Sequence, residues 1–231
     1  MKKVLNLSLA LSATLFLAAH APAQKRTPRP TPTPAATPAL APTPAPQPTP
    51  TAEPFEGASV EALGAQCVKL ETDAGTIELK LIPEVAPETV RNFLNLAATG
   101  FYDTTTFSRV VKNFVIQGGN ISTRETITPE LAARARRKIP DEPSPVKHVR
   151  GIVSMARPDT PNSATTNFFI LVGTGSHLDG KFSAFGRVTR GMDVVDAINQ
   201  AAVEGEKPLT PVRLASARVV PCAAGTPAPA Q

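Results

Sequence analysis

The chain has 231 residues, of which 42% are hydrophobic and 19% charged, so its composition excludes a wholly disordered protein. Of the formal net charge of +5, +4 comes from the first 54 residues, because residues 55–231 carry 19 basic and 18 acidic side chains. The folded part of the chain therefore has no overall charge that would attract nucleic acid.

Residues 1–23 have the pattern of a secretory signal peptide. Two lysines follow Met1, residues 4–19 are mainly apolar, and residues 21–23 (Ala-Pro-Ala) supply small residues for cleavage. An uncleaved membrane anchor is the alternative, but the apolar run is shorter than the roughly 20 residues that span a bilayer. We therefore expect a periplasmic or secreted protein of the cell envelope, with no stable membrane insertion after signal cleavage.

Residues 24–54 contain eleven of the 25 prolines, and most of their neighbours are Thr and Ala. Proline fixes φ and lacks an N–H group, so this spacing favours extended polyproline II and cannot build a core. We expect a disordered, semi-rigid linker that holds the following domain away from an envelope surface. A docking ligand for a proline-recognising partner is the alternative.

One folded domain is expected over residues 63–224, after a lead-in at residues 55–62 and before a disordered tail at residues 225–231. Over this range the sequence changes to short alternating apolar runs bounded by turn residues. Such a texture is typical of a β-rich domain.

The domain is predicted to begin with a β-hairpin, because residues 67–71 and 76–81 alternate between apolar and polar side chains around a turn at residues 72–75. Further short runs of the same kind predict more strands. They cover residues 107–111, 114–117, 152–156, 168–172, 184–188 and 212–220.

Helical spacing of apolar residues occurs in two places. One is residues 90–97, behind a start at Pro87, and the other is residues 192–202, after Gly191. Many strands with two separated helices favour a closed antiparallel β-barrel capped by two α-helices, since closure removes exposed strand edges.

The two cysteines lie at opposite ends of the domain. Cys67 is at the start of the first predicted strand, and Cys222 comes just after the last. An exported chain meets an oxidising compartment, and barrel closure would place the terminal strands side by side, so we predict a Cys67–Cys222 disulfide. Two unrelated buried thiols are the alternative.

Several common kinds of site are excluded. The three histidines, His20, His148 and His177, are far apart in the sequence, and no cluster has metal-ligand spacing. Residues 173–178 begin like a dinucleotide-binding loop, but Leu178 stands where the third glycine belongs. The same segment lacks the glycines that flank a nucleophilic serine. We therefore expect neither a metal nor a cofactor.

Two aromatic runs carry the most specific pattern. Residues 107–119 read FSRVVKNFVIQGG, and residues 167–170 read NFFI, followed by LDGK at residues 178–181. On alternating strands Arg109 and Gln117 face the same side as some of the phenylalanines. A guanidinium beside an aromatic wall fits a proline-binding site.

These runs, together with residues 151–157 (GIVSMAR) and 185–188 (FGRV), are similar to the cyclophilin family of peptidyl-prolyl cis/trans isomerases. The similarity extends from about residue 68 to residue 220. It implies an eight-stranded antiparallel barrel with a helix over each end and a substrate groove on the outside. It also implies proline-containing polypeptide substrates, no cofactor, and a monomer, since the groove lies within one chain. No nucleic-acid partner is expected, because the charges of residues 55–231 nearly balance.

The resemblance also assigns site residues. Arg109 is expected to be the catalytic arginine, and Gln117 to position it and the substrate backbone. Phe114, Val115, Phe169 and Leu178 are expected around the proline ring, Phe114 completing the catalytic set, while Ala156, Arg157 and Asn167 line the subsite for residues before proline. His177 is either a rim residue of the groove or an exposed loop histidine.

The sequence departs from the family pattern at Ser108, Val115, Asn167, His177 and Phe182. These departures leave the arginine and the ring pocket intact. They are expected to alter affinity for the residue before proline and to weaken inhibition by cyclosporin.

The favoured function is an exported bacterial peptidyl-prolyl isomerase that acts on unfolded or flexible polypeptides. The alternative is a module that holds proline segments in the same groove without useful turnover, as a chaperone or assembly partner. Residues 128–138 predict a short basic helix capped by Thr128, for which a solvated face or an acidic partner is favoured over nucleic acid.

Overall fold

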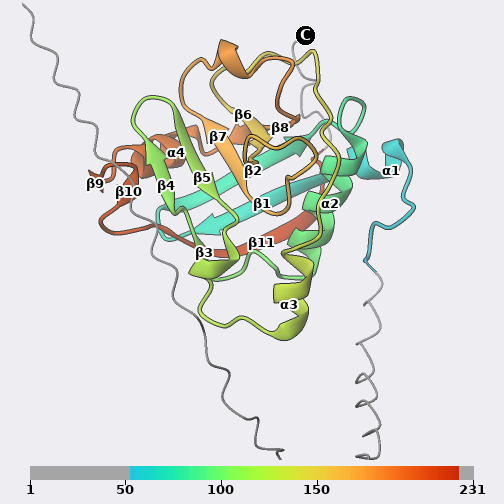
Figure 1. The fold of residues 1–231 in the computed structure, drawn as a ribbon, viewed down its shortest axis with the longest axis horizontal. Coiled ribbons are helices and arrows are strands. Elements are labelled where there is room, and N and C mark those ends of the chain that lie inside the picture. The colour runs from blue at the N-terminus through green and yellow to red at the C-terminus, as the bar shows by residue number, and fades with distance from the viewer. Residues whose placement is uncertain (1–52, 224–231) are drawn as a thin grey trace, which may run out of the picture. The chain divides into compact units, whose positions relative to one another are not determined.

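The computed structural model describes residues 53–223, which are drawn in colour in Figure 1. The expected signal peptide, residues 24–52 of the expected linker and the expected tail lie outside these residues. Within the described range, no helix is long and apolar enough to cross a membrane. The described residues form a mainly β structure with a few helices.

Nine strands form one antiparallel sheet in the order β3-β11-β1-β2-β8-β6-β7-β5-β4 (Figure 1). Two further strands pair only with each other and form a short hairpin, β9–β10. The strands are β1 (Gln66–Thr72), β2 (Gly75–Leu81), β3 (Thr105–Thr106), β4 (Arg109–Val111), β5 (Val115–Gly118), β6 (Ile152–Met155), β7 (Phe168–Leu171), β8 (Ala184–Arg190), β9 (Val203–Glu204), β10 (Lys207–Pro208) and β11 (Arg213–Pro221).

The expectation of a closed eight-stranded barrel is wrong, because the sheet is curled but open, with β3 and β4 at its two edges. Between β3 and β4 the chain changes the strand to which it is hydrogen-bonded. The Phe107 N–H donates to the Val212 carbonyl at 2.9 Å, whereas the next N–H, that of Ser108, donates to the Gln117 carbonyl at 3.0 Å. The two short edge strands therefore belong to different ladders, and the strand expected from residue 107 begins only at residue 109.

Four α-helices lie among the described residues: α1 (Val60–Gly64), α2 (Pro87–Ala98), α3 (Pro129–Arg134) and α4 (Met192–Asn199). The two expected helices are α2, with Pro87 in its first turn, and α4, which follows Gly191. Gly191 has φ of +86°, and a Cβ there would collide with the Thr76 carbonyl, so this start requires glycine.

Helix α2 packs on β11 and β8 over one face of the sheet (Figure 1). Its N-terminus is capped from a distance by Glu142, which accepts hydrogen bonds from the Glu88 and Thr89 N–H groups at 3.0 and 2.7 Å. A carboxylate is favourable there because the first N–H groups of a helix lack partners and the helix dipole is positive at this end.

The sheet carries apolar clusters on both faces, and the neighbouring residues Phe168 and Phe169 show why. Successive side chains on a strand point to opposite faces. Phe168 is fully buried in the main core, with its ring edge-on to Phe93 and Tyr102. Phe169 belongs instead to a smaller cluster, whose buried members are Val115, Ile152, Phe169, Leu171 and Ala184. The smaller cluster forms the floor of the groove described below.

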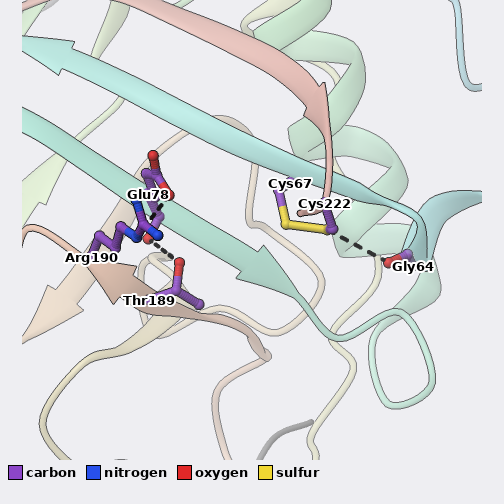
Figure 2. Close-up of a disulfide and its surroundings, with 6 residues drawn as sticks. All are labelled: Gly64, Cys67, Glu78, Thr189, Arg190 and Cys222. Carbon is purple, nitrogen blue, oxygen red and sulfur yellow. Dashed lines mark hydrogen bonds and ion pairs between the residues drawn. A yellow bond between two sulfur atoms is a disulfide. The ribbon is translucent and has the colours of Figure 1, made fainter. Parts of the chain in front are cut away.

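Cys67 and Cys222 form a disulfide between the start of β1 and the residue after β11 (Figure 2). The two strands pair antiparallel, with Cys67 opposite Val220, so the cysteines come to the same end of the pair. Their Cα atoms lie 4.9 Å apart, within the usual range for a bridge. The disulfide therefore joins residues that are 155 positions apart in the sequence.

The basic helix α3 is not simply a solvated face. Thr128 caps it by accepting from the Leu131 N–H at 3.3 Å. Arg134 and Arg137 both pair with Glu53, at the start of the described residues. Two of the four basic side chains in residues 128–138 thus share one carboxylate from the segment that precedes the first strand.

Candidate active site

A groove of about 250 Å³ lies beside the β4–β5 edge, over the smaller apolar cluster. Nine of the ten residues expected at the site line it, and Phe182 is an additional wall residue. The lining residues are Arg109, Phe114, Val115, Gln117, Ala156, Arg157, Phe169, His177, Leu178 and Phe182.

Strand register brings the central residues together. Arg109 of β4 lies opposite Gln117 of β5, and Gln117 lies opposite Phe169 of β7. Residues directly opposite in adjacent strands share a face of the sheet. A guanidinium, an amide and an aromatic ring therefore form one row, although Phe169 is about fifty residues further along the chain.

The β4–β5 turn that carries this row is fixed by Asn199, the last residue of α4. Its side-chain amide donates to the Val111 and Val115 carbonyls at 2.9 and 3.2 Å, and its oxygen accepts from the Asn113 N–H at 2.9 Å. Asn113 has φ of +59°, in the left-handed region that asparagine tolerates better than most residues. Helix α4 thus holds the edge of the groove in place.

Arg109 is held by two acceptors. Its Nη1 donates to Gln117 Oε1 at 3.3 Å, and its Nε donates to Glu206 Oε2 at 2.6 Å. Within residues 53–223, Nη2 of Arg109 makes no hydrogen bond. The guanidinium is therefore oriented while retaining a donor for a ligand.

The apolar wall of the groove is formed mainly by Phe114, Val115, Phe169 and Leu178. Phe169 lines the groove although its side chain is only 6% exposed. His177 is a rim residue, with its ring centroid 5.4 Å from that of Phe114. This wall can accept a small ring such as that of proline.

Arg157 differs from Arg109 in that all three of its nitrogens are engaged. Nε pairs with Asp141 at 3.1 Å, and the Nη groups donate to the main-chain carbonyls of residues 158, 159 and 181. Its guanidinium carbon lies 5.0 Å from the ring centroid of Phe182. Arg157 therefore serves as a fixed wall of the groove rather than as a free donor.

Asn167 is the one expected site residue that does not line the groove. Its carbonyl accepts from the Ala156 N–H at 2.9 Å, which extends the pairing of β6 and β7. Its side-chain Oδ1 is buried without a hydrogen-bond partner. Asn167 thus supports Ala156 through its main chain, and the expected contact of its side chain with substrate stays a prediction.

A buried histidine supports the wall from behind. His148 is fully buried, with Nδ1 3.1 Å from Asp179 Oδ1 and Nε2 3.1 Å from Ser154 Oγ. Its main-chain N–H also donates to Asp179 at 2.8 Å and holds the pKa of that carboxyl below its usual range. Because Asp179 follows Leu178 directly, this contact ties the wall loop to β6.

The folded protein is expected to become less stable as the pH decreases below about 6.5, because of His148. Burial lowers the pKa of His148 below its ordinary value of 6.5, against a smaller opposite effect of Asp179. Just below pH 6.5 the unfolded chain binds a proton at this histidine that the folded chain does not. The contribution of neutral His148 to the free energy of unfolding is therefore complete above pH 6.5 and declines as the pH decreases below it. Thermal unfolding between about pH 8 and about pH 5 should show a steeper decline for wild type than for His148→Gln. Parallel curves would contradict this role.

Among residues 53–223 there is no group of three or more His, Cys, Asp or Glu side chains that could hold a metal ion. The groove offers instead one oriented guanidinium opposite an apolar ring pocket on a curled antiparallel sheet. Fold and site together define a mainly β protein with an apolar surface groove beside one oriented guanidinium.

Comparison with known proteins gives the family. Residues 67–219 match the model of the cyclophilin type peptidyl-prolyl cis-trans isomerase/CLD family, and the chain belongs to this family. The protein is accordingly a cyclophilin-type peptidyl-prolyl cis-trans isomerase.

Two relatives and one solved structure illustrate the similarity. Peptidyl-prolyl cis-trans isomerase CYP23 of Arabidopsis thaliana is 38% identical over 62% of this chain and 65% of its own length. Peptidyl-prolyl cis-trans isomerase A of Dickeya dadantii is 35% identical over 66% of this chain and 84% of its own length. A cyclophilin-type isomerase of Cryptosporidium parvum, solved in the presence of the dipeptide Ala-Pro, has a TM-score of 0.59 and 27% identity, covering 68% of this chain and 99% of that one.

Sequence reasoning did not identify Glu206 as part of the site. Glu206 lies in the β9–β10 hairpin, whose strands have only two residues each. Such short strands carry no periodic signal, and no local pattern places them beside β4. Phe182 was noticed as a departure from the family pattern, but its contact with Arg157 could only be seen in the structure.

Proposed function

We propose that the protein accelerates cis/trans rotation about Xaa-Pro bonds by donating a hydrogen bond from Arg109 to the prolyl nitrogen. The observation that carries this proposal is the set of hydrogen bonds and the position of the Arg109 guanidinium. It is held through Nε and Nη1, it lines the groove opposite the apolar wall, and its Nη2 is unengaged within residues 53–223.

The reaction requires only that the twisted imide bind more tightly than either planar form. Amide resonance creates the barrier of about 18–20 kcal/mol to rotation. Twisting removes this resonance and makes the prolyl nitrogen pyramidal and basic. A fixed N–H donor then stabilises the twisted state selectively, which lowers the barrier.

Two parts of the groove hold the ends of the rotating bond. The wall around Phe114 and Phe169 receives the proline ring, while Gln117 and the Ala156 segment are placed for the polar main chain of the substrate. The related structure solved with Ala-Pro supports a small residue before proline. Arg157 cannot replace Arg109 as donor, because each of its nitrogens already has a partner.

An Ala-Pro peptide titrated into the native protein and followed by NMR exchange tests this proposal, since it reads binding and turnover together. Faster cis/trans exchange at substoichiometric protein is the expected result. Peptide binding without faster exchange would instead favour the second candidate, a module that holds proline segments as a chaperone or assembly partner. The ion pair of Arg109 with Glu206 is the observation that favours this second candidate, because a carboxylate reduces the effective charge of the donor.

We also propose that the substrates are unfolded or flexible exported polypeptides in the periplasm or cell envelope of a bacterium, or outside the cell. The signal-like residues 1–23 support this location, as does the Cys67–Cys222 disulfide, since disulfides persist in oxidising compartments. Mass spectrometry of the protein from an envelope fraction tests it: a mature N-terminus near Gln24 is expected, and an intact Met1 in the cytosolic fraction would contradict it.

A further inference from the structure

Glu206 is a charged residue outside the expected site that contacts Arg109 directly. It is in the turn of the β9–β10 hairpin, next to Gly205, whose φ of +61° makes the tight reversal possible. Its Oε2 accepts from Nε of Arg109 at 2.6 Å. A segment nearly one hundred residues away in the sequence thus reaches the guanidinium directly.

The position of this carboxylate is set by main-chain hydrogen bonds. The Glu206 carbonyl accepts from the Val110 N–H at 2.8 Å, which fixes the turn alongside β4. The base of the hairpin is also tied down, because Lys112 Nζ donates to the Ala201 carbonyl at 2.6 Å and the Leu209 N–H donates to the Ala202 carbonyl at 2.8 Å. Figure 1 shows the hairpin on the β4 side of the sheet, and β10 contacts β4. The hairpin therefore presents Glu206 from a fixed place.

The ion pair contributes little to folding, because both side chains are well exposed, Arg109 at 41% and Glu206 at 54%. Its effect falls instead on the conformation of Arg109. An arginine side chain has many rotamers, and an exposed one loses its orientation unless something holds it. Gln117 holds one terminal nitrogen at the long distance of 3.3 Å, so the shorter contact at Nε is the stronger restraint.

We infer that Glu206 is a positioning residue, which holds the guanidinium of Arg109 so that its terminal nitrogens face the prolyl nitrogen. This inference rests on the function proposed above. The carboxylate engages Nε and leaves Nη2 available, so it orients the donor without occupying it. Because Arg109 acts on the twisted state, loss of the restraint should lower kcat and leave KM for a ground-state peptide unchanged.

The test compares Glu206→Ala and Glu206→Gln with a matched control, Glu204→Ala. Glu204 is the other carboxylate of the same hairpin, it is exposed, and it makes no ion pair within the described residues. We expect Glu206→Ala to lower kcat for an Ala-Pro peptide by about three- to tenfold at unchanged KM. Glu206→Gln retains an acceptor for Nε and should stay within about twofold of wild type, as should Glu204→Ala.

Two results would overturn the inference: a kcat of Glu206→Ala equal to or above that of wild type, or a Glu206→Gln variant no better than Glu206→Ala. A purely structural role is distinguished by thermal unfolding, since a structural loss would lower the midpoint without selective loss of kcat. Arg109→Ala is measured in parallel. If it retains full activity, the proposed function fails, whereas if it alone loses activity, only the role of Glu206 fails.

Discussion

Arg109→Ala is expected to lower kcat/KM for an Ala-Pro peptide by about 10²- to 10³-fold, the range found when one preorganised donor to a transition state is removed. The variant loses the donor to the prolyl nitrogen but keeps the apolar wall, so peptide affinity should change far less than turnover. The fold should tolerate the change, because the side chain is 41% exposed and pairs with an even more exposed carboxylate. NMR exchange gives both quantities in one experiment.

A second arginine of the groove, Arg157, provides a control variant for Arg109→Ala. Arg157→Ala removes the other guanidinium, whose nitrogens are already engaged by Asp141 and main-chain carbonyls. Its effect should appear in KM, through loss of the wall that it forms with Phe182. Arg109→Lys retains the charge but not the planar fork, and should recover only a small part of the lost rate. Equal activity of Arg109→Ala and wild type would rule out the proposed mechanism.

Removal of the disulfide is expected to have the largest effect on stability. The bridge closes a loop between residues 155 positions apart, for which the chain-entropy relation gives about 5 kcal/mol at 25 °C as an upper value. The double variant Cys67→Ser/Cys222→Ser should therefore unfold at a much lower denaturant concentration than the oxidised protein. Denaturant unfolding followed by circular dichroism measures the difference.

The reduced wild-type protein is the control for that measurement. It should unfold at the same denaturant concentration as the double variant, because both lack the bridge. A single Cys222→Ser variant should have the same unfolding midpoint. A free-thiol count on oxidised protein, native and denatured, should be zero. Two free thiols, or equal stability of oxidised and reduced protein, would contradict a stabilising bridge between β1 and β11.

Local pattern was enough to predict most of the sheet. The alternation on either side of residues 72–75 corresponds to the β1–β2 hairpin, and the helices expected after Pro87 and Gly191 are α2 and α4. Barrel closure was predicted wrongly, because it depends on which strand each residue of a short edge strand forms its main-chain hydrogen bonds with. The main-chain hydrogen-bond partner changes from Val212 to Gln117 between Phe107 and Ser108, and the hydrophobic pattern does not indicate this change.

The site shows the same division between local and distant information. Nine groove residues could be predicted because they lie in motifs that the family shares, and strand register then aligns them. Glu206 could not be predicted, since its place depends on a hairpin that packs on β4 from far along the chain. Asn167 is the one expected site residue outside the groove lining, and its role toward substrate stays a prediction.

The most direct test of the account is a crystal structure of the protein with an Ala-Pro peptide bound. We expect the proline ring against Phe114 and Phe169, and a terminal nitrogen of Arg109 within about 3.2 Å of the prolyl nitrogen, a normal hydrogen-bond distance. Glu206 should remain on Nε in that complex. A peptide bound elsewhere, or an Arg109 guanidinium turned out of the groove with its terminal nitrogens occupied by Glu206, would contradict the proposed mechanism.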